Sequence, residues 1–153
     1  GLGRPGRVDP APRGESPRSP TLSPMTDAER LAGLVAVWWE AVDSFTRVLE
    51  HVADEQWSAP TDLPGWDVRA VAAHTAHLEA LLAGRPHDEV EVGEVPHAHG
   101  VMGRFTEQGV LVRRDETPDA LITEIREATT ARHTQLLEDA PGEERARQLF
   151  AAA

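Results

Sequence analysis

Apolar residues recur every three or four positions through four long stretches of this chain, and no stretch of useful length alternates apolar with polar residues. Positions three and four apart share one face of an α-helix, whereas alternation is typical of a half-buried strand. The pattern predicts an all-α fold, an antiparallel four-helix bundle, with helices over about 27–53, 68–83, 97–113 and 117–139. The longest apolar stripe lies in the first of them: Leu31, Leu34, Val35, Trp38, Val42, Phe45, Leu49 and Val52.

Local signals set the ends of these helices. Thr26 and Glu29 have the spacing of a capping box, and Asp67 is a favourable N-cap for the second helix. Gly84 suits the residue that follows a helix C-terminus. Within the second helix we expect one apolar stripe to face the core: Val68, Val71, Thr75, Leu78 and Leu82.

The composition changes sharply near Met25, which is a candidate for the true start of the protein. Residues 1–24 hold six of the 12 prolines together with four arginines. Such a segment buries too little apolar surface to offset its ordering entropy, so we expect a disordered Pro- and Arg-rich extension. We assign 25–140 to the helical-bundle domain and 141–153 to a tail or the start of a truncated last helix.

Charge and composition exclude several classes of function. The net charge of −11 opposes binding to nucleic acid, whose phosphates need clustered basic side chains. No apolar run approaches the 18 residues of a membrane span, and the first 24 residues lack the apolar region of a secretory signal. The absence of cysteine excludes disulfides and thiolate metal ligands within the chain, and it fits a reducing, cytoplasmic location. All 15 basic residues are arginine, a usage that suggests a high-GC genome such as that of an actinobacterium.

The histidines are the residues most able to carry chemistry. His74 lies two turns into the second helix, beside its apolar stripe, where an imidazole needs either a hydrogen-bond partner or a metal. His77 is three residues further and shares a helix face with His74. His97 and His99 flank a loop-to-helix boundary and would point the same way only in an extended segment. For each histidine taken alone, a hydrogen-bonded or exposed side chain is the commoner outcome.

One run of residues resembles a known family. The segment Leu63-Pro64-Gly65-Trp66-Asp67-Val68-Arg69, followed by His74, is similar to the metal-binding N-terminal domain of mycothiol-dependent maleylpyruvate isomerases, within the DinB-like superfamily. Weaker similarity continues in 103–110 and 117–121, so the resemblance covers roughly 26–137.

The resemblance implies a four-helix bundle that holds a divalent metal, usually zinc, between its helices. It also implies isomerase or S-transferase chemistry on a small-molecule substrate, with mycothiol as the co-substrate. The metal would lower the pKa of the thiol and supply a thiolate, which adds to an electrophilic double bond. One metal ligand of the family maps onto His74.

The other two family ligands lie in a Glu-x-x-x-His pattern on a later helix, and these 153 residues do not contain that pattern. His77 is a weaker substitute candidate. The alternative to the enzyme is therefore a non-catalytic helical bundle, truncated or diverged, that has lost the complete metal site. Such a protein would expose an apolar stripe, and a homodimer that covers it is one expectation.

Overall fold

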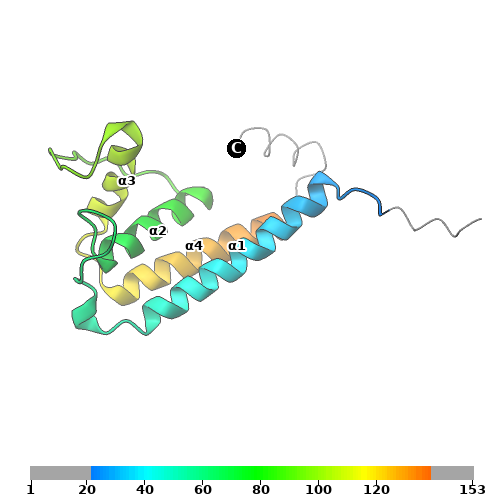
Figure 1. Cartoon of the computed structure of the whole chain (residues 1–153), viewed down its shortest axis with the longest axis horizontal. Helices are drawn as coiled ribbons and strands as arrows, with labels where there is room; N and C mark the ends of the chain where they lie inside the picture. Colours follow the sequence, from blue (N-terminus) through cyan, green and yellow to red (C-terminus); the bar gives the residue numbers. More distant parts are fainter. Residues whose placement is uncertain (1–21, 139–153) are drawn as a thin grey trace, which may run out of the picture.

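The computed structural model describes residues 22–138 as an all-helical chain (Figure 1). This result confirms the predicted all-α bundle. The predicted extension over 1–24 and the predicted tail over 141–153 lie outside the described residues, apart from 22–24. Within residues 22–138 there are four α-helices, one short 3₁₀ helix and no strand: α1 (Asp27–Glu50), η1 (Asp54–Gln56), α2 (Val68–Leu82), α3 (Gly100–Val112) and α4 (Pro118–Glu138).

The predicted caps are present. The Thr26 side chain accepts a hydrogen bond from the Glu29 backbone, and the Glu29 carboxylate accepts from the Thr26 backbone, which completes the capping box of α1. Gly84 has φ +86° just after α2, the left-handed conformation that suits a residue at this position. The helix α3 begins at Gly100 rather than near 97, because a turn closed by the Ala98 N–H and the Val95 carbonyl precedes it.

The helices pack in a layered order, with α1 against α4, α4 against α2, and α2 against α3. In Figure 1, α1 runs antiparallel to α4, whereas α2 and α4 run in the same direction. The long connection that contains α3 carries the chain back across the molecule and allows this parallel pair. The helix α2 therefore has neighbours on two sides.

The most buried residues of α2 differ from the predicted apolar stripe. Its most buried apolar positions are alanines, namely Ala70, Ala72, Ala73, Ala76 and Ala80. The expected stripe is only partly buried, and Leu82 is 54% exposed. Small side chains allow α3 and α4 to approach α2 closely from both sides, so the alanine faces form the core and the larger residues lie at its edges.

The large core side chains come from the other elements. Leu121 and Ile125 of α4 are fully buried, and they pack with Leu49 of α1 and with Trp57, which follows η1. The Trp57 indole donates to the Val52 carbonyl at 3.3 Å, and the Trp57 carbonyl accepts from the Arg69 N–H at 2.9 Å. Trp57 thereby fixes the loop that leads into α2.

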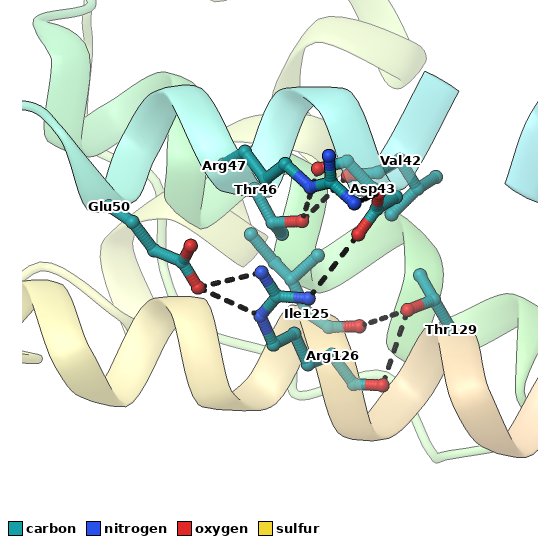
Figure 2. Close-up of polar contacts among 8 residues, drawn as sticks. All are labelled: Val42, Asp43, Thr46, Arg47, Glu50, Ile125, Arg126 and Thr129. Atoms are coloured by element: carbon teal, nitrogen blue, oxygen red, sulfur yellow. Dashed lines mark hydrogen bonds and ion pairs between the residues drawn. The ribbon is translucent and has the colours of Figure 1, made fainter. Parts of the chain in front are cut away.

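Polar contacts reinforce the pairing of α1 with α4 (Figure 2). The Arg126 guanidinium of α4 binds the Glu50 carboxylate at 2.6 Å and lies 3.6 Å from Asp43, both on α1. The buried hydroxyls of Thr46 and Thr129 each donate to a carbonyl one turn earlier in their own helix. Because Arg126 and Glu50 are each 41% exposed, we expect their ion pair to contribute less than about 1 kcal/mol. Apolar packing therefore carries most of this interface.

No helix in the part of the chain that the structure describes combines the length and apolarity needed to cross a membrane.

Candidate functional site

The turn before α2 places the candidate site. The Trp66 N–H donates to the Leu63 carbonyl at 3.1 Å, and Gly65 inside this turn has φ +80°, a conformation that favours glycine. The Asp67 carboxylate then accepts from the Ala70 N–H at 2.8 Å, as an N-cap does. The turn and the cap together fix where α2 begins, and so fix the direction of the histidine two turns later.

His74 is partly buried on α2, and its ring lies against the indole of Trp66. The ring centroids are 4.8 Å apart with planes tilted by 42°. Its Nδ1 atom is buried and has no hydrogen-bond partner among residues 22–138. A buried nitrogen without a partner costs about 1–3 kcal/mol, so this atom needs an explanation. Burial also lowers the pKa of His74, which favours the neutral imidazole that can donate a lone pair.

Glu107 of α3 is the polar centre beside this pair, although nothing in its sequence context singled it out. It is only 5% exposed. Its Oε2 atom accepts from the Trp66 indole N–H at 2.8 Å and lies 3.0 Å from Nε2 of His97. One carboxylate oxygen therefore joins α3 to the turn before α2 and to the loop before α3.

His97 occupies space that only a glycine at position 65 leaves free. A Cβ built on Gly65 would overlap the Nδ1, Cγ and Cε1 atoms of the His97 ring. Gly65 is thus required both for its backbone conformation and for the close approach of His97. His99 is exposed at the start of α3 and does not join this arrangement, so His97 and His99 do not act as a pair.

His77 belongs to a different cluster from His74. It is 2% exposed, and its Nε2 lies 2.9 Å from Nδ1 of His87, whose own Nε2 lies 2.9 Å from Oε1 of Gln108. The Phe105 ring stacks on His87 at 4.4 Å. These contacts attach the loop after α2 to α2 and α3, so His77 has a structural partner that explains its burial without a metal.

The direction of hydrogen bonding in this cluster can be worked out. The Gln108 Nε2 donates to the Val90 carbonyl at 2.9 Å, so its Oε1 faces His87 as an acceptor. His87 Nε2 then carries the hydrogen, His87 Nδ1 accepts, and His77 Nε2 donates. The Nδ1 of His77 is left without a partner among residues 22–138.

Burial and nearby positive charge both act on His77. Burial, then the charge of Arg113 and smaller contributions from His87 and His74, lowers the pKa of His77 to about 4, against a smaller opposing effect of Glu124. His77 is therefore neutral at neutral pH, which agrees with the hydrogen-bond direction.

The other histidines serve local roles. His51 Nδ1 bonds the Arg47 carbonyl at 2.7 Å on the surface of α1. The His133 ring of α4 stacks on Trp39 of α1, with centroids 4.0 Å apart and planes within 10°. Neither belongs to a group of three or more His, Asp or Glu side chains that could hold a metal ion within residues 22–138.

A metal at His74 needs further donor atoms close by. Within residues 22–138, no three His, Asp or Glu side chains are grouped so that they could hold an ion. A tightly bound zinc needs three or four ligands. The described residues thus supply Nδ1 of His74 as a candidate donor, and not a complete set.

A cavity lies elsewhere, away from His74. It measures about 680 Å³ and is lined by the 90–94 segment with Arg104 and Gln108. Gln108 joins this cavity to the His77–His87 cluster, and His74 does not line it.

A comparison with protein families identifies the chain. The model of the mycothiol maleylpyruvate isomerase N-terminal domain matches residues 38–149, which include the turn, His74 and Glu107. No curated protein and no solved structure matches the chain. Because the family match spans more than half of the sequence and the fold is a helical bundle, the chain belongs to the family of mycothiol maleylpyruvate isomerase N-terminal domains, which are DinB-like.

Proposed function

We propose that this chain is the metal-binding domain of a mycothiol-dependent isomerase or S-transferase that acts on a small molecule, with His74 as a metal ligand. The observation that carries the proposal is the buried, partnerless Nδ1 of His74 on the helix that follows the Pro-Gly-Trp turn. The family match supports the class of enzyme.

The role of His74 is limited to what its geometry allows. A neutral imidazole offers one lone pair to a divalent cation, and the lowered pKa keeps that lone pair available at neutral pH. A bound metal with an open position would favour the thiolate form of mycothiol. Residues 22–138 supply no further grouped donors for such an ion. His77 is not proposed as a ligand, because its Nε2 is bonded to His87 and its Nδ1 lies against the backbone of Gly109.

Three finer assignments belong to the same proposal. Zinc is the proposed metal because it accepts imidazole nitrogen readily and needs no redox partner. The chain has no cysteine, which fits the reducing cytoplasm, where a low-molecular-weight thiol is available. Its use of arginine without lysine fits an actinobacterial genome, and mycothiol is the thiol of that group.

Metal analysis tests the proposal directly. Wild-type protein and a His74→Ala variant would be purified with zinc present, dialysed against a weak chelator, and measured for zinc by mass spectrometry. We expect wild type to retain zinc and His74→Ala to lose most of it. A His51→Ala variant, which removes an exposed histidine, is the matched control and should retain zinc. Equal zinc in wild type and His74→Ala would eliminate His74 as a ligand.

A second function is favoured by one observation, the lack of a grouped donor set within residues 22–138. On this alternative the chain is a non-catalytic bundle that has lost the complete site and associates through an exposed apolar face. Light scattering together with metal analysis separates the two proposals. A metal-free dimer would support the alternative, a metal-loaded protein would support the enzyme, and a metal-free monomer would count against both.

A further inference from the structure

Packing alone does not explain why the carboxylate of Glu107 is buried. Placing a carboxylate in the interior costs several kcal/mol unless donors compensate it. Its two donors, the Trp66 indole and the His97 imidazole, come from segments 41 and 10 residues away along the chain. An apolar side chain would fill the same space without requiring either donor. The buried carboxylate is therefore explained by its hydrogen bonds to the Trp66 indole and the His97 imidazole.

The Trp66 indole connects Glu107 to His74. Its Nε1–H is bonded to Glu107, and its ring lies against the ring of His74. An indole fixed at its nitrogen cannot swing about its side-chain torsions, so the surface that it presents to His74 is fixed as well. His97, the second donor to Glu107, occupies the space over Gly65 in the turn that carries Trp66.

We infer that Glu107 is a positioning residue, which acts through the Trp66 indole to hold the His74 ring in the orientation that leaves its Nδ1 unpaired. The inference rests on the proposed role of His74 for its functional meaning, and on the Glu107–Trp66–His74 contacts for its structural content.

The same chain offers a matched control. Glu79 of α2 is 9% exposed and accepts from the indole of Trp38 at 3.1 Å, so it repeats the chemistry of the Glu107–Trp66 pair. Trp38 has ring contacts with Trp39 and His133, and none is described with His74. Removing Glu79 therefore imposes a similar loss of a buried carboxylate without touching the His74 ring.

The test monitors the signals of the His74 imidazole in metal-free protein by nitrogen–proton NMR. A His74→Gln variant assigns these signals. We expect Glu107→Ala and Trp66→Phe to shift or broaden the His74 ring signals. Glu79→Ala should leave them in place. Glu107→Gln, whose amide oxygen can still accept the indole hydrogen, should retain the wild-type signals. His74 signals that stay unchanged in both Glu107→Ala and Trp66→Phe would overturn the inference, as would a Glu107→Gln spectrum as altered as that of Glu107→Ala.

Zinc titration of the same proteins supplies a second readout. Loss of groups that orient a metal-binding histidine costs about 10–100-fold in metal affinity, so we expect roughly tenfold weaker zinc binding in Glu107→Ala and wild-type affinity in Glu79→Ala. The two proposals fail separately. If wild type binds no zinc while the NMR result holds, the metal role of His74 is wrong and the positioning by Glu107 stands.

Discussion

The His77 ring lies directly on the backbone of Gly109, so that a Cβ at position 109 would overlap the Cγ and Nδ1 atoms of the imidazole. Gly109 is buried within α3, where glycine is otherwise unfavourable by about 1 kcal/mol relative to alanine. The glycine is thus explained by the close approach of α2 and α3 at a buried histidine.

Gly109→Ala should therefore destabilise the protein despite its better helix propensity. Overpacking a close contact costs about 1–3 kcal/mol, which exceeds the gain in propensity. Gly33→Ala on α1, where nothing lies within 4 Å of the added Cβ, should instead stabilise by about 0.5–1 kcal/mol. Urea unfolding monitored by circular dichroism measures both, and a stabilising Gly109→Ala would show that the His77 contact is looser than described.

Stability should fall in mild acid because of His77. Its pKa is about 4 in the folded protein, below the ordinary value of 6.5, so the unfolded chain binds this proton more tightly. Above pH 6.5 this group does not reduce the free energy of unfolding. As the pH falls toward 4, it lowers that free energy by up to about 3 kcal/mol. The lowered pKa of His74 acts in the same direction.

Unfolding free energies at pH 7.5, 6 and 5 would measure this dependence. His77→Gln should flatten the acid decline, and His51→Gln controls for the loss of one histidine from the surface. An equally steep decline in His77→Gln would assign the acid sensitivity to other groups.

Gly65→Ala should disturb the candidate site more than Gly84→Ala does. Both glycines have positive φ, so alanine costs roughly 1 kcal/mol at either position from backbone strain alone. Only at position 65 does the added methyl also overlap the His97 ring. We expect Gly65→Ala to cost at least about 1 kcal/mol more than Gly84→Ala and to shift the His97 signals in imidazole NMR spectra. Equal costs with unmoved His97 signals would contradict the described packing of His97 on Gly65.

Glu124→Gln should cost more than Glu50→Gln. Glu124 makes a two-oxygen contact with Arg113, at 2.9 Å from Nε and 2.7 Å from a terminal nitrogen, and Arg113 is only 9% exposed. Removing the acidic charge leaves a buried guanidinium uncompensated, which should cost about 2–3 kcal/mol. The Glu50 pair with Arg126 is exposed and should contribute less than about 1 kcal/mol. The comparison is made by urea unfolding at two salt concentrations, and similar costs for the two variants would show that burial of Arg113 does not matter.

Helix ends were predictable because capping is local. Thr26 with Glu29, Asp67, and Gly84 each act within a few residues of their position, so their types indicate their roles without knowledge of the rest of the fold. The buried face of α2 was predicted wrongly, because hydrophobicity favoured Leu78 and Leu82, whereas packing on two sides favoured alanine.

The candidate site was predicted only in part. His74 could be identified from the turn before α2, and its metal role stays a prediction. Glu107 could not be identified from the sequence, because a glutamate on an amphipathic helix usually faces solvent. The partners of Glu107 are also distant along the chain. His97 was noticed as a loop residue, but its pairing with Glu107 depends on how α3 packs. Interactions between residues far apart in sequence carry no spacing signal, so only the fold reveals them.

The layered order of the helices has a consequence for how the molecule opens. The principal neighbour of α1 is α4, whereas α2 is enclosed between two helices. Leu34, Val37 and Val48 of α1 also remain largely exposed. Partial unfolding should begin with detachment of α1, and amide protons there should exchange with deuterium sooner than those of α2. The residues that surround His74 would then stay folded after α1 has detached, so the environment of this histidine is preserved during partial unfolding.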